Sequence, residues 1–337
     1  MGQITLDAYT VEVSNTDRVL FPDDSITKGD LIDYYHRIAT VMLPHLRERP
    51  LNMQRFPRGI AAAGFWQQDT PNYFPEWVER VTVEKEEGGL VTHVVCNNAA
   101  TLVYLANQAC VTQHIWLSRA SQLRNPDRMV FDFDPSHDED FDSVISAVWA
   151  LKGLLEEMDL TPLVMTTGSR GLHVVIPLDG HADFPVVRAF AQDVASVLVS
   201  RYPRNLTIEQ RKGRRQGRVF VDTLRNSYGQ TMVAPYSVRA KPGPLVATPL
   251  DWNELSDSKM HPQRYTLKNI FLRLGQRDDP WEQMPRHAVS LVNRERSGSA
   301  GRLNDESQKD VILRSAAKRR IWGEASYPSP DSSLRSE

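Results

Sequence analysis

The chain has 337 residues, of which 41% are hydrophobic, with a formal net charge of −2 and a pI near 6.5. That content is enough for one large domain or two packed lobes. The charge argues against a generally basic nucleic-acid protein, so any nucleic-acid surface must be a local basic patch. We expect no signal peptide and no membrane span, because the sequence has neither a charged and apolar leader nor an apolar run of about 18 residues. The two cysteines, Cys96 and Cys110, lack metal-ligand spacing and are predicted to be reduced core residues of a cytoplasmic protein.

Three helices are predicted from apolar residues at helical spacing. The first covers residues 27–43 and ends before Pro44, with Thr27 as N-cap and Asp30 completing a capping box. Further along the chain, two helices are expected at 141–158 and 185–202, and strands at 91–95, 129–134, 163–166, 172–177 and 218–224. The order strand, helix, strand, tight turn, strand, helix, strand predicts an α/β (α+β) sandwich with antiparallel pairs, and argues against a doubly wound parallel sheet. Residues 1–295 are expected to form the folded domain and 296–337 a polar, disordered tail, because the composition changes there to Ser, Gly, Arg, Lys and Asp.

The segment Arg128-Met-Val-Phe-Asp-Phe-Asp-Pro135 places two carboxylates two positions apart in an apolar run. In a strand, Asp132 and Asp134 would project from the same face. Two carboxylates held that close repel each other unless a cation lies between them, and their hard oxygens suit Mg²⁺ or Mn²⁺. Such ions most often serve phosphate chemistry. A strand end that runs into an acidic loop is an equally good interpretation of these two residues alone.

A tight glycine loop follows in Thr166-Thr-Gly-Ser-Arg-Gly-Leu-His173. Gly168 and Gly171 allow a sharp turn and close approach to a ligand, and successive N–H groups in such a loop can point at a phosphate. A plain hairpin would have the same glycines, and a lone histidine at the start of a strand is more often structural. Side chains in this loop that could add donors or charge are Thr167, Ser169, Arg170 and His173.

Two further features follow in Arg218-Val-Phe-Val-Asp222 and Pro235-Tyr-Ser-Val-Arg-Ala-Lys-Pro242. Asp222 ends an apolar strand, and a third carboxylate near the first two would complete a two-metal site. Arg239 could clamp a triphosphate through charge-assisted hydrogen bonds. Alone, Asp222 could equally begin a turn, and Arg239 would be unremarkable.

The segment Arg211-Lys-Gly-Arg-Arg-Gln-Gly-Arg218 concentrates positive charge directly before the strand that ends in Asp222. It is predicted to form a hairpin tip. Like charges gather unfavourably unless a polyanion is nearby, which favours contact with DNA. The alternative is a solvated loop. The predicted DNA contacts here are Arg211, Lys212, Arg214 and Arg215.

In this order, the segments resemble the polymerase domain of bacterial ligase D, the end-joining branch of the archaeo-eukaryotic primase superfamily. The resemblance runs from about residue 15 to residue 250. It implies a primase-like fold whose catalytic core is an RRM-like antiparallel sheet flanked by helices. Besides the motifs above, it rests on Asn15-Thr-Asp-Arg-Val-Leu-Phe-Pro22, Thr27-Lys28, Asp33-Tyr-Tyr35, the stretches 47–59 and 97–105, Gly64-Phe-Trp-Gln-Gln68 and His114-Ile-Trp-Leu-Ser118.

The resemblance implies a role for each matching position. Two ions, Mn²⁺ or Mg²⁺, would be bound by Asp132, Asp134 and Asp222. The triphosphate of an incoming NTP or dNTP would be held by Thr167, Ser169, His173 and Arg239, with His114 near the sugar and phosphates. Family members favour ribonucleotides and often prefer Mn²⁺.

The resemblance also implies contacts with DNA. Arg18 and Lys28 match positions that grip the 5′-phosphate downstream of a gap, and Phe65 and Trp66 match an aromatic pair that stacks on template bases. The basic segment matches a hairpin that reaches toward DNA. The chain departs from the family where Gln68 replaces Lys, Asn98 replaces Asp and Trp66 replaces Phe.

We therefore expect a DNA-dependent, ribonucleotide-preferring nucleotidyltransferase that fills short gaps or extends primers at breaks by two-metal catalysis. It resembles stand-alone relatives, for which a separate DNA ligase and a Ku-like protein are the expected partners and the bacterial nucleoid the expected location. One alternative is an Asp-x-Asp glycosyltransferase, which leaves Asp222 and the basic segment unexplained. The other is a non-catalytic module that binds DNA gaps or ends, which leaves three carboxylates unexplained.

Overall fold

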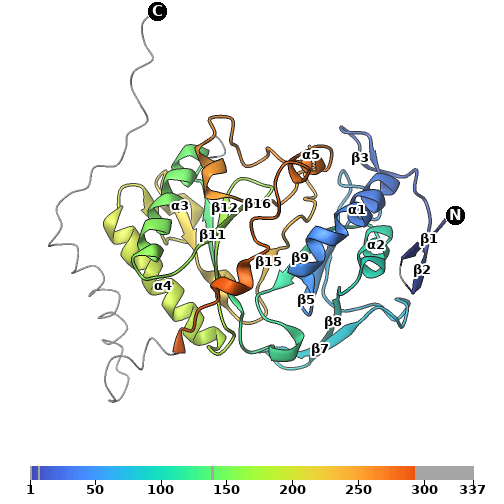
Figure 1. Ribbon diagram of the computed structural model, residues 1–337, viewed down its shortest axis with the longest axis horizontal. Helices are drawn as coiled ribbons and strands as arrows, with labels where there is room; N and C mark the ends of the chain where they lie inside the picture. The colour runs from blue at the N-terminus through green and yellow to red at the C-terminus, as the bar shows by residue number, and fades with distance from the viewer. Residues whose placement is uncertain (1, 7, 138–139, 293–337) are drawn as a thin grey trace, which may run out of the picture.

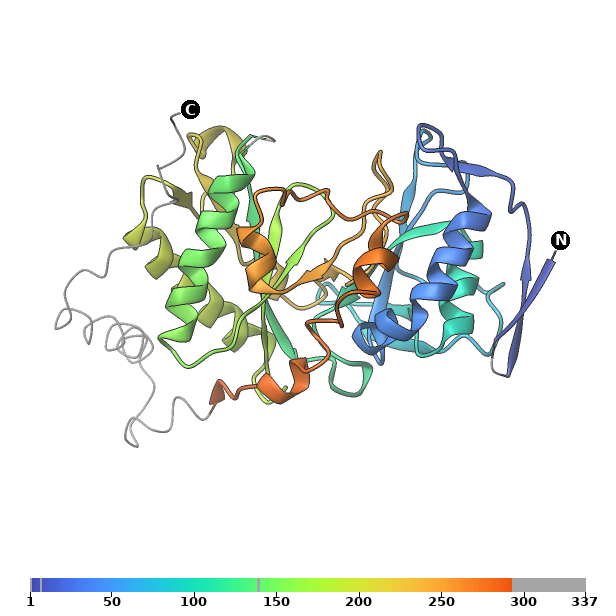
Figure 2. The same ribbon diagram turned by 45° about the horizontal axis from the view of Figure 1, so that its top comes forward.

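The computed structural model describes residues 2–6, 8–137 and 140–292. They form two lobes side by side, each built on a β-sheet with helices against it (Figures 1 and 2). The predicted tail, 296–337, lies outside the described residues. Within the described ranges, no helix has the length and apolar character needed to cross a membrane.

The first lobe contains a six-stranded sheet in the order β13-β14-β10-β12-β11-β16. Neighbouring strands are antiparallel, except that β13 and β14 run parallel. The central strand β10 is buried along nearly its whole length, since α3 and α4 pack against this sheet (Figure 1). The bounds are β10 (Arg128–Asp134), α3 (Phe141–Glu156), β11 (Leu163–Thr166), β12 (Leu172–Pro177), α4 (Phe184–Arg201), β13 (Leu206–Thr207), β14 (Val219–Asp222) and β16 (Pro249–Leu250).

The second lobe is built on the sheet β15-β9-β5-β8-β7, with β6 paired to β5. Helices α1 and α2 lie side by side against it, and the β1–β2 hairpin lies beyond them (Figure 2). The bounds are β1 (Gly2–Leu6), β2 (Tyr9–Val13), β3 (Val19–Phe21), β4 (Ile26–Thr27), α1 (Lys28–Leu46), β5 (Pro50–Arg55), β6 (Phe65–Gln67), β7 (Arg80–Glu84), β8 (Leu90–Val95), α2 (Ala99–Asn107), β9 (Cys110–Trp116) and β15 (Thr231–Val233). Short helical turns complete the chain: η1 (Ala120–Gln122), η2 (Lys212–Arg214), η3 (Leu224–Asn226), η4 (Trp252–Ser256), α5 (Ile270–Leu274) and η5 (Met284–His287).

One continuous hydrophobic core runs through both lobes. Two buried hydroxyl groups anchor α1. Tyr35 donates at 2.7 Å to the carbonyl of Val111 on β9 of the same lobe, and Tyr34 donates at 2.7 Å to the carbonyl of Tyr236, which lies in the segment that runs from β15 of this lobe to β16 of the other. The predicted antiparallel sheet core flanked by helices is therefore confirmed. Cys96 and Cys110 are free and buried in this core, as predicted.

The first predicted helix begins as expected but ends later. Thr27 and Asp30 form the capping box, with Thr27 N–H donating to Asp30 Oδ2 at 2.7 Å and Asp30 N–H to Thr27 Oγ1 at 3.2 Å. The prediction that Pro44 stops the helix was wrong, since α1 continues to Leu46. Proline removes the hydrogen bond to the carbonyl four residues earlier, and here that carbonyl belongs to Thr40, an exposed residue that water can solvate.

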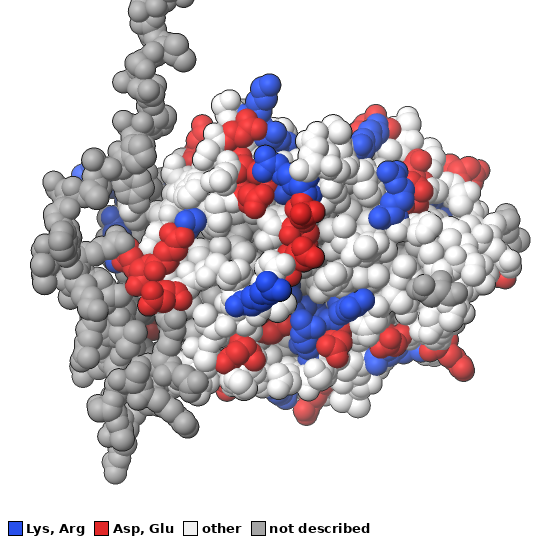
Figure 3. Space-filling model, viewed as in Figure 1, with Lys and Arg blue, Asp and Glu red and all other residues white. Residues whose placement is uncertain are grey.

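The basic segment is not a hairpin tip, contrary to the prediction. It belongs to the loop 208–218 between β13 and β14, which pair in parallel with Leu206 opposite Val219. Parallel neighbours require a connection that crosses back along the sheet, and this loop supplies it. Its side chains Arg211, Lys212 and Arg214 are exposed. On the face of the molecule that Figure 3 shows, Lys and Arg are interspersed with Asp and Glu, as the near-neutral net charge predicts.

Candidate active site

The sheet of the first lobe brings three predicted carboxylates to one place. Asp132 on β10 lies directly opposite Asp222 on β14, and on its other side opposite His173 on β12. Residues directly opposite in antiparallel strands have Cβ atoms about 5 Å apart. Asp134 follows two positions later on β10 and projects from the same face. The strand register thus gathers the three aspartates and His173 across three strands.

The buried carboxylate of Asp132 has two cationic or potentially cationic neighbours. His173 Nε2 lies 3.4 Å from its Oδ1, and Arg225 Nη2 lies 3.4 Å from its Oδ2. Burial alone would raise the pKa of Asp132, but these two neighbours outweigh burial and lower that pKa to about 2. Asp132 is therefore ionised at neutral pH.

The two other carboxylates experience the opposite effect. Burial, together with the charge of Asp132, raises the pKa of Asp134. Burial is also the largest cause of the raised pKa of Asp222, with Asp132 again contributing, although the N–H of Leu224 opposes it. Negative charge is thus crowded at this edge of the sheet, which is the condition that a bound cation relieves.

The donor set fits a divalent ion, because carboxylate oxygens are the ligands that Mg²⁺ and Mn²⁺ prefer. The side chains as they lie do not yet form its coordination sphere. Among residues 2–6, 8–137 and 140–292, no group of three or more His, Cys, Asp or Glu is arranged to hold a metal ion. Asp132 instead pairs with Arg225.

The glycine loop joins β11 to β12 and packs tightly on its surroundings. A Cβ on Gly171 would lie 2.0 Å from the carbonyl oxygen of Phe133 on β10. Gly168 has a φ of +60°, and a Cβ there would lie 2.7 Å from Cγ of Arg239. Glycine at both positions therefore lets the loop lie between the carboxylate strand and the segment that carries Arg239.

The polar side chains of this loop have neighbours in the same region. The hydroxyl of Thr167 donates to the carbonyl of Gly171 at 3.1 Å, and Lys241 Nζ donates to the hydroxyl of Ser169. Arg170 lies near enough to Asp134 for its charge to oppose the rise in that pKa. Loop and carboxylates thus form one region.

The second lobe contributes His114, which lies on β9. Its pKa is well below the usual value because it is buried and because Arg239 and Arg225 lie nearby. Burial also lowers the pKa of Arg239 to about 10, while the charge of Asp132 acts in the other direction. The exposed ring of Trp66 stands edge-on to His114, with centroids 4.8 Å apart. The site therefore spans the junction between the lobes.

Three buried nitrogens in this region lack hydrogen-bond partners among the described residues. They are His114 Nε2, His173 Nδ1 and Arg225 Nε. Buried polar atoms are normally paired, so unpaired ones that gather around a carboxylate cluster indicate a place where a polar ligand binds. Their basic character favours an anionic ligand.

The residues predicted to contact DNA are distributed around this region. Phe65 and Trp66 on β6 are 45% and 54% exposed, so their rings are available for stacking. The guanidinium of Arg215 stacks on Phe220 of β14 at 3.9 Å, while Arg211, Lys212 and Arg214 are exposed in the loop before that strand.

The two residues predicted to grip a 5′-phosphate differ in accessibility. Arg18 is exposed and donates from Nη1 to the carbonyl of Pro57 at 2.7 Å. Lys28 is buried, and its Nζ donates to the carbonyl and to Oδ1 of Asn107 at 3.0 and 2.8 Å. Burial and the charge of Arg18 lower the pKa of Lys28. Arg18 is the residue of the two that can meet a phosphate without rearrangement.

Arg225 is a site residue that the sequence reasoning missed. It lies in η3, whose next residue, Asn226, anchors this turn to β10 by bonding both the N–H and the carbonyl of Val130, at 2.8 and 2.7 Å. The available signal was its position three residues after Asp222, at the end of an apolar strand.

Comparisons with known proteins match most of the chain to one family. Residues 27–281 match the model of the family described as "LigD, primase-polymerase domain". The multifunctional non-homologous end joining protein LigD of Mycolicibacterium smegmatis is 32% identical over 76% of this chain and 34% of that protein. The bifunctional LigD of Bacillus subtilis is 28% identical over 80% of this chain and 43% of that protein. The chain thus spans well under half the length of these relatives.

A solved structure shares the fold. The polymerase domain of Mycobacterium tuberculosis ligase D in complex with DNA superposes with a TM-score of 0.77 at 30% sequence identity. The match covers 83% of this chain and 99% of that one.

Proposed function

The chain belongs to the LigD primase-polymerase domain family, and on that premise we propose that it is a DNA-directed nucleotidyltransferase that acts at gaps or breaks in duplex DNA. The observation that carries this proposal is the gathering, at the junction of the lobes, of three carboxylates and three buried nitrogens that find no hydrogen-bond partner in the described part of the chain. The complex of the M. tuberculosis domain with DNA and the end-joining names of the curated relatives support it.

The proposed reaction joins a primer 3′-hydroxyl to the α-phosphate of an incoming NTP, and pyrophosphate leaves. Two Mn²⁺ or Mg²⁺ ions, when bound, would lower the pKa of the attacking hydroxyl and neutralise the leaving group. Asp132, Asp134 and Asp222 would hold these ions. The chain itself contributes mainly positioning and charge stabilisation.

The nucleotide would be held from both lobes. The triphosphate would lie against the glycine loop, where it would meet Thr167, Ser169, Arg170 and His173, with Arg239 opposite. His114, neutral at pH 7 because its pKa is depressed, would contact the sugar or phosphates through Nε2, which has no hydrogen-bond partner within the described ranges. The proposal includes a preference for ribonucleotides, which the resemblance to the family implies.

The DNA would approach along the faces that carry the exposed aromatic rings and the basic loop. Phe65 and Trp66 would stack on template bases, and the loop 208–218 would contact the backbone. Arg18 would meet the 5′-phosphate downstream of a gap. A separate DNA ligase and a Ku-like protein are the proposed partners, since the curated relatives are named for end joining.

The decisive experiment is extension of a primer across a short gap with a downstream 5′-phosphate, in Mn²⁺, with NTPs or dNTPs. We expect incorporation that favours NTPs. Asp132→Ala should abolish synthesis and leave gap binding largely intact, whereas Asp33→Ala, which removes an exposed carboxylate on α1, should match the wild type. Tight gap binding without incorporation of either nucleotide set would instead identify a non-catalytic binding module.

A further inference from the structure

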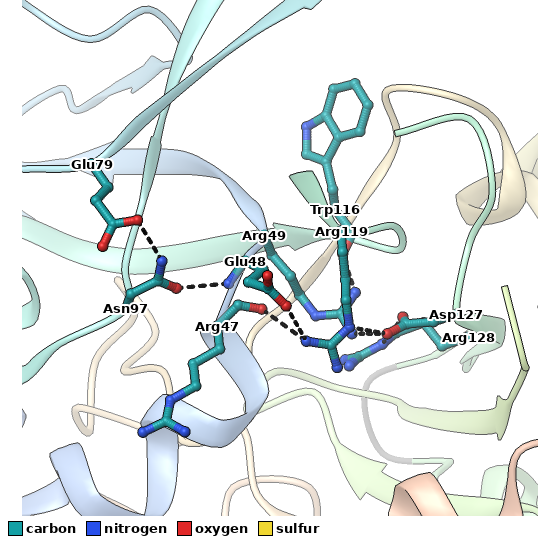
Figure 4. Close-up of polar contacts among 9 residues, drawn as sticks. All are labelled: Arg47, Glu48, Arg49, Glu79, Asn97, Trp116, Arg119, Asp127 and Arg128. Carbon is teal, nitrogen blue, oxygen red and sulfur yellow. Dashed lines mark hydrogen bonds and ion pairs between the residues drawn. The ribbon is translucent and has the colours of Figure 1, made fainter. Parts of the chain in front are cut away.

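Three arginines converge on Asp127, which directly precedes β10. This is the other end of the strand from Asp132 and Asp134. Arg49 Nη2 lies 2.5 Å and Arg119 Nε 2.9 Å from Asp127 Oδ2, and Arg128 Nε lies 3.4 Å from Oδ1 (Figure 4). A second carboxylate, Glu48, reaches Arg119 at 3.4 Å, but its side chain is 55% exposed. Three guanidinium groups thus surround the carboxylate of Asp127, which is mostly buried, whereas that of Glu48 is exposed.

Two of these guanidinium groups are buried and incompletely paired. Arg49 and Arg128 are 0% and 2% exposed, so bulk water does not solvate them. Arg49 Nε and Arg128 Nη1 have no hydrogen-bond partner among the described residues. Burial, together with the charge of Arg49, lowers the pKa of Arg128 to about 9. A buried and unbalanced positive charge is unfavourable unless an anion compensates it.

This cluster borders a cavity of about 590 Å³. Arg119, Asp127 and Arg128 form one wall, and the other walls come from the end of α1, the end of β12 and the segment 274–288. Much of the remaining surface is apolar, from Leu178, Leu274, Trp281 and Met284. The volume lies in the range of small-molecule sites, and an apolar surface with a few polar groups is typical of them.

The cavity is separate from the candidate active site. Arg128 begins β10 and Asp134 ends it. Six residues of extended strand span about 20 Å. A ligand in the cavity would therefore contact both lobes without touching the nucleotide.

The acidic groups of the cavity restrict what it can accept. Asp179 pairs with His181 at 2.8 Å and Asp279 with His45 at 2.6 Å, so both are engaged. Further acids, Asp278 and Glu282, are exposed at its edge. They would repel a triphosphate or another polyanion, whereas a single carboxylate matches the fork of a guanidinium.

We propose that this cavity is a second binding site, which takes a small monocarboxylate with an apolar body. The carboxylate binds at Arg119 and Arg128, and the apolar body lies against Leu178, Leu274 and Trp281. Because its walls come from both lobes, the ligand favours one relative placement of the two sheets.

The test is calorimetric titration of the full chain with benzoate, and with benzamide as the neutral analogue. Benzoate should bind saturably, with a Kd on the order of millimolar for a ligand of this size, and benzamide about tenfold more weakly, because it lacks the charge. Phenyl phosphate, with its larger negative charge, should also bind more weakly than benzoate. Equal binding of benzoate and benzamide, or no saturable binding of benzoate, would overturn the proposal.

Four variants locate the binding. Arg119→Ala should weaken benzoate binding about tenfold by removing a charge-assisted contact, and Thr40→Trp, an exposed α1 position on the cavity wall, should block it without altering the arginines. Arg286→Ala, an exposed arginine outside the cavity, and Arg239→Ala, in the nucleotide site, should bind benzoate like the wild type. Binding that Arg239→Ala abolishes and Thr40→Trp leaves unchanged would assign benzoate to the active site and refute the second site.

Discussion

Arg225 occupies a position beside Asp132 that a divalent ion would also need. Its Nη2 lies 3.4 Å from Oδ2 of that carboxylate, and its Nε has no partner among the described residues. Asp132 also lies directly opposite Asp222 in the pairing of β10 with β14. The guanidinium therefore offsets part of the negative charge of the cluster and competes with a cation for the same oxygen.

Replacing this arginine should strengthen metal binding. In Arg225→Gln, a divalent ion no longer has to displace a guanidinium from Asp132. The ion pair between Arg225 and Asp132 is partly exposed and is worth about 1 kcal/mol. Mn²⁺ should therefore bind the variant about fivefold more tightly. Titration of Mn²⁺ followed by electron paramagnetic resonance, without DNA or nucleotide, measures this directly. Arg225→Lys, which keeps the charge, and Arg124→Gln, an arginine stacked on Tyr228, are the controls. Weaker Mn²⁺ binding in Arg225→Gln would show that the guanidinium supports the metal site.

The glycine loop gives a prediction about folding. Gly171→Ala places a Cβ 2.0 Å from the carbonyl oxygen of Phe133, so either β10 or the loop must move. We expect the free energy of unfolding to fall by about 3 kcal/mol or more, because overpacking against backbone cannot relax through a side-chain rotation. Gly213→Ala is the matched control, since a Cβ there meets nothing within 4 Å. Urea unfolding of both variants measures the difference, and equal stability would refute the close packing of the loop.

The contact between α1 and the segment around Asp279 predicts a pH dependence of stability. Burial would raise the pKa of Asp279, but hydrogen bonds with His45, the N–H of Trp281 and the hydroxyl of Tyr236 outweigh it and lower that pKa. A depressed carboxyl pKa stabilises the fold above the unfolded value near 4, and this stability is lost as the pH falls through the folded value.

Asp279→Asn should therefore destabilise the protein at pH 7, and the difference from the wild type should shrink below about pH 4. Urea midpoints at pH 7, 5 and 3 give the comparison. Asp278→Asn, at the exposed neighbouring position, should show no such dependence. A difference between Asp279→Asn and the wild type that stays constant down to pH 3 would contradict the proposed linkage.

Local sequence signals predicted some elements well and others not at all. Strands β11 and β12 have the bounds predicted for them, 163–166 and 172–177, because the glycine turn between them marks where β11 ends and β12 begins. Helix α2 (Ala99–Asn107) was missed because it is buried almost all round and shows no polar face. The basic loop was misinterpreted as a hairpin, since nothing in a sequence shows that the strands on either side run parallel.

The candidate site shows the same division. Asp132 and Asp134 could be paired from their spacing, whereas their approach to Asp222 depends on the register of β14 against β10, two strands separated by more than 80 positions in the chain. The only signal for Arg225 in the sequence was its position after Asp222, and its place beside Asp132 follows from the anchoring of η3 by Asn226. The positions of Asp222 and Arg225 beside Asp132 depend on long-range strand register and packing, which residue type alone does not reveal.

Recognition of a downstream 5′-phosphate should depend on Arg18 more than on Lys28. Arg18 is exposed, whereas the ammonium of Lys28 is buried against Asn107. Arg18→Ala should therefore remove most of the preference for a 5′-phosphorylated gap, about tenfold in Kd at low salt. Lys28→Met should mainly lower the free energy of unfolding, because it removes the hydrogen bond to the carbonyl of Asn107 and leaves Asn107 Oδ1 with the N–H of Ser14 alone.

Fluorescence anisotropy with phosphorylated and unphosphorylated gaps, together with urea unfolding, separates these two effects. Arg37→Ala removes an exposed arginine of α1 and is the control for a general loss of charge. If Lys28→Met keeps its stability but loses the phosphate preference, Lys28 must leave Asn107 to reach the phosphate, and the assignment to Arg18 is wrong. If the wild type binds both gaps equally, neither Arg18 nor Lys28 recognises the 5′-phosphate.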